Sequence, residues 1–444
     1  MRRSANWVAR PRHTDSAGQA GARPRGHSRL RYGLIAASAI PVVLAAACSS
    51  SAAAGGGSTS SSASSGSILV GAVAAESGTF GAYGTADVKG MQAQIDLINA
   101  SGGVLGHQLK LDAIDDQSDP SKAGVAAQQL LSGSQVPLLI HAGAVSVDAA
   151  PVIAVTSRAK VITMTPAATP AFEDPKQDPY DFVVFPSSDL QVTATAAGLK
   201  QLIPGDTKVG LLSSNDTGGQ AIIQAMQQGL PAAGLTVVGS QAVSDTATDM
   251  TPQLQALKSA GAQILFLQFA SPAQFVTAMD DIQTMGWKSV RALAGTTAIA
   301  ATTMTAIPAA VTSQFAALGT LSLSRSGSAA SLQPKIQTFV NELNKIGGNT
   351  ALLLESLNGA DEINLLVWAI NHAHSIQPAA VYAALNGTAS TPVPSSQLYQ
   401  VPPPAWSGTN HGLSGANFTS YWALLSPGTP LEGTYKGAVI PLTS

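Results

Sequence analysis

The sequence predicts an α/β protein with two lobes, each built on a mostly parallel β-sheet flanked by helices. From Ile68 onward, short apolar runs alternate with longer segments whose apolar residues recur with a helical period, which is the pattern of βαβ units. Residues 68–444 also exceed what a single hydrophobic core usually organises, which indicates two lobes. Charged residues make up only 11% of the chain and aromatic residues 5%, and this composition favours closely packed small side chains.

The segment before the folded part has the features of an export signal. Residues 1–32 contain eight arginines and a single acidic residue, and residues 33–47 are uncharged. Because the apolar stretch is shorter than the roughly 20 residues of a membrane-spanning helix, residues 1–47 are predicted to be a signal peptide. Cys48, the only cysteine, directly follows three alanines, which resembles a bacterial lipobox, although Leu44 stands four residues before it rather than three. We predict that Cys48 becomes the lipidated N-terminus; an ordinary signal peptide with an incidental cysteine is the alternative.

Residues 48–67 are predicted to form the lipidated cysteine and a flexible linker. The tract after Cys48 consists almost entirely of Ser, Gly and Ala, which bury too little apolar surface to fold and would act as a spacer from the membrane. Removing the leader takes away 8 of the 23 basic residues and 1 of the 25 acidic ones, which leaves 15 against 24. A net charge of −9 argues against nucleic acid or anionic lipid as a partner. With no second cysteine, the fold must hold without disulfides or thiolate metal sites.

The individual elements can be placed from the same patterns. Strands are predicted where short apolar runs are bounded by turn residues, at 68–74, 109–115, 137–143, 160–166, 208–214, 235–243, 263–270 and 289–295. Helices are predicted where apolar residues recur every three or four positions, at 86–100, 121–132, 148–157, 219–233, 250–260, 272–285, 332–346 and 360–373. Because open α/β sheets bind ligands at the carboxyl ends of their strands, the residues just after each strand are the candidates for a binding site.

The first third of the folded part carries an ordered set of short motifs. They are Ser77-Gly78, Tyr83-Gly84, Gly90, Ile98-Asn99-Ala100, Gly102 to Gly106, Asp115-Asp116-Gln117 and Asp119-Pro120. In this order they resemble the type I periplasmic solute-binding proteins of the branched-chain (Leu/Ile/Val-type) amino-acid class, the solute receptors of ABC importers. Weaker similarity continues to the end of the chain. The resemblance implies a two-lobed Venus-flytrap fold with three crossovers between the lobes, which closes on a small molecule without catalysis.

On this fold, residues 68–187 and 324–405 are expected to form the first lobe, and residues 188–323 and 406–444 the second. The implied partners are a small-molecule ligand and the membrane subunits of an ABC permease, with the membrane contacted through the lipid anchor. The protein is expected to be a monomer on the extracytoplasmic face of the plasma membrane, without cofactor or metal.

Ser146 is the first candidate for ligand binding. It follows the strand predicted at 137–143 and opens a helix, so its hydroxyl and the neighbouring N–H groups can face a ligand anion. A simple helix N-cap is the alternative. The resemblance favours binding, because Ser146 matches a carboxylate-binding serine of the family. Asp148, in the first helical turn, suits the helix dipole but would repel an anionic ligand if it faced the cleft.

The loop from Pro166 to Pro170 is the second candidate. Its prolines fix the backbone, and the hydroxyl of Thr169 can donate and accept a hydrogen bond. In the resembling family this loop holds the ligand through a backbone carbonyl and the threonine, which implies that Ala167, Ala168 and Thr169 bind the ligand; a rigid turn is the alternative. Tyr83, after the first strand, would add an aromatic wall to the pocket or be an ordinary packed tyrosine.

The predicted second lobe lacks two features of amino-acid-binding relatives. Those relatives place there a carboxylate for the ligand's ammonium group and aromatic residues against its side chain. Here the strand end before Thr296 carries no acid, and Phe269 is the aromatic residue nearest the end of the preceding strand. A buried ammonium without a counter-charge costs several kcal/mol. Either Asp216 or Glu76 supplies the counter-charge, or the ligand is not an α-amino acid.

These observations favour a lipid-anchored substrate-binding protein that delivers a small solute to an ABC permease. The solute could be a branched-chain or other hydrophobic amino acid, or a related small carboxylate or amide. A ligand-binding sensor of the same fold, not coupled to transport, is the alternative. An enzyme is poorly supported, because the chain has no G-x-S-x-G, no H-E-x-x-H and no phosphate-binding glycine loop. His141 ends a strand near the expected cleft and is more simply a packed histidine than a catalytic one.

Overall fold

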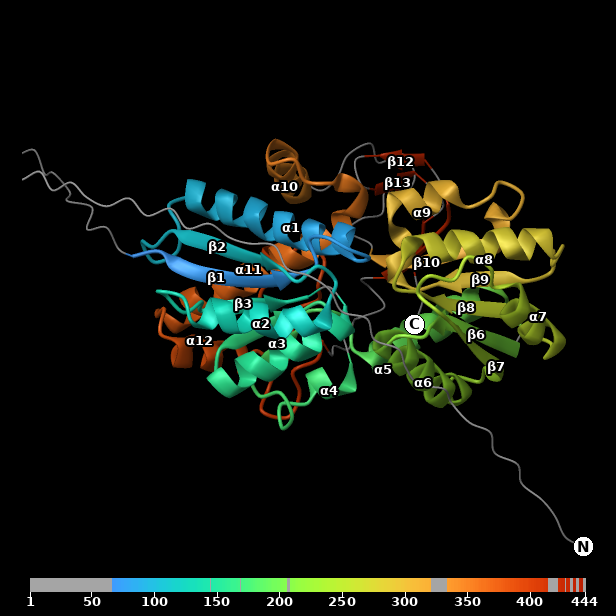
Figure 1. The fold of residues 1–444 in the computed structure, drawn as a ribbon, viewed down its shortest axis with the longest axis horizontal. Helices are drawn as coiled ribbons and strands as arrows, with labels where there is room; N and C mark the ends of the chain where they lie inside the picture. Colours follow the sequence, from blue (N-terminus) through green and yellow to red (C-terminus); the bar gives the residue numbers. More distant parts are fainter. Residues whose placement is uncertain are drawn as a thin grey trace, which may run out of the picture. The chain divides into compact units, whose positions relative to one another are not determined.

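The computed structural model describes residues 66–143, 145–167, 169–205, 208–320, 334–413 and 422–427, and the backbone of three short strands between 429 and 441. The predicted signal peptide, Cys48 and the linker up to residue 65 lie outside the described residues, as does Ala168. The described residues form two α/β lobes, each with its own central sheet (Figure 1).

The first lobe is built on a five-stranded parallel sheet in the order β2-β1-β3-β4-β5. Helices cover both faces, which explains why the strands β1, β3 and β4 are almost entirely buried. Helices α1, α11 and α12 pack on one face, and α2 and α3 on the other (Figure 1). The bounds are β1 (Ile68–Ala74), β2 (Leu109–Asp115), β3 (Leu139–Ala142), β4 (Ile162–Thr165), β5 (Asp181–Val183), α1 (Gly81–Ala100), α2 (Pro120–Leu131), α3 (Ser146–Ala159), α11 (Leu353–Ala373) and α12 (Pro378–Leu385).

The second lobe repeats this topology and extends it. Five parallel strands run in the order β7-β6-β8-β9-β10, and β11 and β14 continue the sheet in antiparallel fashion beyond β10. Helices α5 and α6 cover one face and α7, α8 and α9 the other (Figure 1). The bounds are β6 (Lys208–Ser214), β7 (Thr236–Val243), β8 (Ile264–Gln268), β9 (Arg291–Ala294), β10 (Phe315–Thr320), β11 (Trp422–Leu425), β14 (Val439–Pro441), α5 (Ser188–Leu202), α6 (Thr217–Ala232), α7 (Thr251–Ser259), α8 (Pro272–Thr284) and α9 (Ala301–Ala306).

The strand order reverses once in each lobe, where β1 lies between β2 and β3 and where β6 lies between β7 and β8. Such a reversal leaves a crevice at the carboxyl ends of the strands. The chain passes from the first lobe to the second between Val183 and Ser188. The other two passages, after Thr320 and after Leu413, include segments outside the described residues. The remaining α-helices and strands are α4 (Pro170–Glu173), α10 (Pro334–Lys345), β12 (Thr429–Leu431) and β13 (Thr434–Lys436).

The eight predicted strands are confirmed, with both ends of each within two residues of the observed bounds. The prediction missed β5, β10, α4, α5, α9 and α12. The strand β5 is only three residues long, and β10 is rich in Ala and Gly, which have low strand propensity. The sequence of α5 distributes Thr, Ala and Gly around the helix and therefore lacks a clear apolar stripe.

The predicted boundary between lobes after residue 405 is wrong by several residues. Trp406 is fully buried in the core of the first lobe, where its ring lies 5.0 Å from that of Phe182 in β5. His411 stacks on the same ring at 4.2 Å, and Leu413 bridges to Pro186. The segment is rich in Pro and Gly and carries no periodic pattern, so the sequence does not indicate that it belongs to the first lobe.

Candidate functional site

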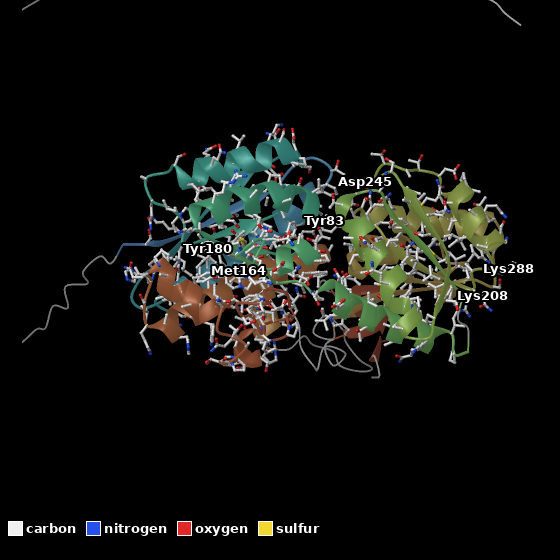
Figure 2. The ribbon with its side chains drawn as sticks, turned by 90° about the horizontal axis from the view of Figure 1, so that it is seen from below. Tyr83, Met164, Tyr180, Lys208, Asp245 and Lys288 are labelled. Atoms are coloured by element: carbon white, nitrogen blue, oxygen red, sulfur yellow. The ribbon has the colours of Figure 1, made fainter. Side chains whose placement is uncertain are left out.

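A cavity of about 120 Å³ lies between the two lobes, at the carboxyl ends of the parallel strands of both sheets. The first lobe contributes the segments after β1, β3 and β4 and the first turns of α11, and the second contributes the segments after β6, β8 and β9. Tyr83 of α1 marks the position, on the side of the first lobe that faces the second (Figure 2). Six predicted site residues line this cavity, namely Tyr83, Ser146, Ala167, Asp216, Phe269 and Thr296.

Ser146 opens α3 at the cavity and is 92% buried, with 8% of its surface exposed. The N-cap residue is Val145, and no side chain caps this helix within the described residues. Ser146 is therefore not the N-cap considered as the alternative. Its hydroxyl and the N–H groups of Ser146 and Val147 are available to an anion, whereas the N–H of Asp148 donates to the carbonyl of Val145 at 3.1 Å. Asp148 is also buried, without a hydrogen-bond partner among the described residues, but it is not one of the residues that line the cavity.

Asp216 lines the cavity from the second lobe, where it caps α6. Its carboxylate accepts a hydrogen bond from the N–H of Gly219 at 2.9 Å, and it also accepts one from the hydroxyl of Ser214. A Cβ placed on Gly218 would lie 3.4 Å from Oγ of Ser146, so α6 approaches α3 closely across the cavity. The carboxylate of Asp216 is thus already engaged by its own helix.

Apolar side chains form much of the remaining wall. Phe80 and Phe185 of the first lobe line it, and sequence reasoning missed both. Phe269 lines it from the second lobe, although its ring is fully buried and packs against Phe275 at 5.0 Å. Tyr83 is 5% exposed, and its hydroxyl has no hydrogen-bond partner among the described residues. An aromatic wall with an unpaired hydroxyl suits a ligand that is partly apolar and partly polar.

The loop after β4 contributes less than the resemblance implies. Pro166 and Ala167 line the cavity, but Thr169 does not. The hydroxyl of Thr169 accepts a hydrogen bond from the N–H of Phe172 at 3.4 Å and so caps α4. Ala168 lies outside the described residues. Glu76, one of the two counter-charges considered from the sequence, is also not among the lining residues.

Two acidic residues that sequence reasoning missed line the cavity, Asp87 of α1 and Glu355 of α11. Burial raises the pKa of Asp87 well above its ordinary value and raises the pKa of Glu355 to about 7. Asp87 stands between Ala86 and Val88, and Glu355 follows three leucines, which is a signal that could have suggested burial.

A buried histidine lies behind these acids. Nδ1 of His141 is 3.0 Å from Glu362, and its Nε2 is 4.0 Å from Oδ2 of Asp87. Burial opposes a charge on His141, but the carboxylates of Glu362, Asp87 and Asp116 outweigh this effect and raise its pKa to about 9. His141 therefore forms a buried ion pair with Glu362. It does not line the cavity, and no group of His, Cys, Asp and Glu among the described residues is arranged to hold a metal ion.

Comparison with known families identifies the fold. Residues 67–416 match the family model described as periplasmic binding protein, which is most of the chain. The chain belongs to this family. Members of the family bind solutes outside the cytoplasm, and the relatives matched by this periplasmic binding protein are solute-binding proteins rather than enzymes. None of the described helices combines the length and the apolar character needed to cross a membrane.

The curated relatives are distant. This periplasmic binding protein is 26% identical over 199 residues to a Leu/Ile/Val-binding protein homolog of Brucella melitensis, an alignment that covers 45% of this chain and 53% of that protein. It is 24% identical over 194 residues to the Leu/Ile/Val-binding protein of Escherichia coli, over 43% and 51% of the two chains. The chain thus spans about half the length of the curated relatives it matches.

Solved structures share the fold over most of the chain. The branched-chain amino acid transporter substrate-binding protein of Streptococcus pneumoniae, in complex with isoleucine, matches with a TM-score of 0.65 at 17% identity and covers 84% of this chain and 99% of its own. A solute-binding protein of an ABC transporter from Rhodopseudomonas palustris, in complex with 4-hydroxybenzoate, matches with a TM-score of 0.66 at 19% identity over 84% and 96%. The shared fold is thus found with amino acids and with aromatic acids as ligands.

Proposed function

We propose that this protein is the substrate-binding protein of an ABC importer and binds a small amphipathic carboxylate, a branched-chain or other hydrophobic amino acid in the first place, between its two lobes. The observation that carries this proposal is the cavity between the lobes, which combines the uncapped N-terminus of α3 with an apolar wall. A helix N-terminus binds a carboxylate through its N–H groups and dipole. The apolar wall suits a hydrophobic side chain.

The names of the relatives support this ligand class. The curated relatives are named for binding leucine, isoleucine and valine, and one structural neighbour holds isoleucine. Because another structural neighbour holds 4-hydroxybenzoate, aromatic and other small carboxylates are the second ligand class in this proposal. The proposal also includes the ABC permease as the partner that receives the solute, with this protein acting as a monomer.

A thermal-shift screen of the purified chain tests the ligand class. Branched-chain and aromatic amino acids, their deaminated acids, their amides and polyols are compared at equal concentration. A ligand at 100 times its dissociation constant adds about 2.7 kcal/mol to the free energy of unfolding, which moves a melting curve visibly. We expect stabilisation by leucine-like compounds. Stabilisation by polyols alone, or by no member of the panel, would contradict the proposed function.

Cys48 is proposed to anchor the protein to the extracytoplasmic face of the plasma membrane through lipid, after removal of residues 1–47. The support for this is the single cysteine placed after a basic and apolar leader. Cys48→Ala is expected to move the protein from the membrane fraction to the soluble fraction of fractionated cells. A Cys48→Ala variant that stays with the membrane would rule out the lipid anchor.

A further inference from the structure

Two buried carboxyl groups lie on the first-lobe side of the cavity, and one of them, that of Asp87, has no hydrogen-bond partner among the described residues. Asp87 is 1% exposed and Glu355 is 8% exposed, and both line the cavity. Neither carboxylate oxygen of Asp87 has a hydrogen-bond partner among the described residues. A buried carboxylate without a partner is costly. The described part of the chain therefore leaves the carboxylate of Asp87 without a hydrogen-bond donor, with His141 4.0 Å away as its nearest charged neighbour.

The packing of α1 against α11 fixes Asp87 at this place. A Cβ on Gly90 would lie 1.9 Å from the backbone oxygen of Ser356, and one on Gly359 would lie 2.3 Å from the backbone oxygen of Asp87. The two helix backbones are thus in direct contact, which only glycine permits at these two positions. The contact between the two helices therefore fixes the backbone position of Asp87.

The two helices also run in the same direction, with their N-terminal ends at the cavity. Farther from the cavity, the amide of Gln94 donates a hydrogen bond to Asn364 at 2.8 Å. At the cavity end, Leu352 packs in one apolar cluster with Tyr83. Glu355 follows Leu352 by three residues, so it lies in the same layer as Tyr83 and contributes to the rise in the pKa of that phenol.

The positive charge nearest to this pair is already used. His141 lies 4.0 Å from Asp87 but 3.0 Å from Glu362, so its charge is balanced by Glu362. Among the described residues that line the cavity, none is Lys, Arg or His. A cation that compensates both carboxylates must therefore come from the occupant of the cavity.

We infer that Asp87 and Glu355 bind the cationic group of the solute, and that this group is an ammonium. The inference rests on the proposed function and deepens it. The ammonium donates hydrogen bonds to the two carboxylates, while the carboxylate of the same solute accepts them from Ser146 and the N-terminus of α3. The counter-charge missing from the second lobe is thus supplied by the first lobe, through residues other than Asp216 and Glu76.

The titration of the pair follows from its surroundings. The titratable groups that face it are Tyr83 on α1, His141 on β3 and Glu362 on α11. Burial raises the pKa of Asp87 well above its ordinary value and raises the pKa of Glu355 to about 7. A bound ammonium favours the ionised carboxylates, so binding releases protons and strengthens as the pH rises to neutrality.

Four related probes test the assignment by calorimetry on the purified full chain. They are L-leucine, leucinamide, 3-methylbutylamine and 4-methylpentanoate, of which only the last lacks an ammonium group. We expect L-leucine to bind far more tightly than 4-methylpentanoate. Glu355→Gln should weaken L-leucine binding by about 10- to 100-fold, the range for losing a hydrogen bond to a charged group. The same substitution should leave 4-methylpentanoate unchanged or bound more tightly.

Matched variants separate this role from a general effect on folding. Asp87→Asn should weaken L-leucine binding as Glu355→Gln does, whereas Glu76→Gln, which removes an acid outside the cavity, should not. All three variants should keep a cooperative melting transition. Equal affinity of the wild type for L-leucine and 4-methylpentanoate, or full affinity of Glu355→Gln and Asp87→Asn for L-leucine, would overturn the assignment alone. Failure of every solute in the screen and of all four probes to bind would overturn the proposed function, and the assignment with it.

Discussion

The two lobes each direct a helix N-terminus at the cavity, but they differ in what is left for a ligand. In the second lobe, the carboxylate of Asp216 caps α6 and is engaged by Gly219 and Ser214. In the first lobe, no side chain caps α3 within the described residues, and Ser146 opens onto the cavity. The acidic residues that line the cavity differ in the same respect, because Asp87 and Glu355 belong to the first lobe and do not cap a helix. On the proposed function, the first lobe recognises charge and the second lobe encloses the ligand.

The largest loss of ligand affinity should come from a substitution that keeps the second lobe away from Ser146. A Cβ on Gly218 would lie 3.1 Å from Oδ1 of Asp216 and 3.4 Å from Oγ of Ser146, so the larger Gly218→Val side chain would enter the space beside Ser146. We expect L-leucine affinity to fall more than 100-fold in calorimetry, with Gly218→Ala intermediate. Gly408→Val, where a Cβ meets open space, is the matched control. Full affinity of Gly218→Val would mean that the lobes do not meet at this point around the ligand.

The acid pair of the first lobe predicts a pH-dependent affinity. Below its pKa of about 7, Glu355 must lose its proton before it can bind an ammonium. L-leucine affinity should therefore fall by at least about tenfold per pH unit once the pH is below 7, and more steeply where Asp87 also releases a proton. The ligand keeps the same charge in this range, and the facing groups Tyr83 and His141 keep theirs. Glu355→Gln should reduce the slope between pH 5 and 7 and leave the contribution of Asp87, and an unchanged slope in that variant would show that Glu355 is not responsible.

Ser146→Ala tests the anion side of the first lobe. Loss of the hydroxyl should weaken binding of L-leucine and 4-methylpentanoate by about 1–2 kcal/mol, as for a hydrogen bond to a charged group. Binding of 3-methylbutylamine, which has no carboxylate, should not change. Ser157→Ala, at the far end of the same helix, provides the control. An equal loss for all three probes would mean that Ser146 acts on the shape of the cavity rather than on the carboxylate.

The residues of the cavity differ in how well the sequence predicts them, according to whether they follow a strand or lie within a helix. The parallel strands were predictable because their apolar runs are buried on both faces, and residues after strands such as Ser146 and Thr296 follow from the topology alone. Asp87 and Glu355 were not predictable in this way. They lie within helices, and their place at the cavity depends on how α1 packs on α11, which apolar neighbours in the sequence do not reveal.

Helix caps also show a limit of prediction from the sequence. Asp216 and Thr169 each follow a strand and precede a helix, as a ligand-binding residue would. A small change in side-chain orientation decides whether such a residue caps its own helix or faces a ligand. The sequence pattern is the same in both cases and cannot distinguish them. Both carry out the capping role in the structure, while Ser146, one position further into its helix, does not.

Thr169→Val should therefore have the smallest effect on binding and a measurable effect on stability. Valine cannot accept the hydrogen bond from the N–H of Phe172, so loss of the α4 cap should lower the free energy of unfolding by about 1 kcal/mol. Because the hydroxyl does not line the cavity, L-leucine affinity should remain within twofold of the wild type. Urea unfolding and calorimetry on Thr169→Val and on Thr169→Ser, which keeps a capping hydroxyl, separate the two effects. Reduced affinity with unchanged stability in Thr169→Val would instead place this hydroxyl on the ligand, as the family resemblance implies, and would extend charge recognition by the first lobe to a third strand end.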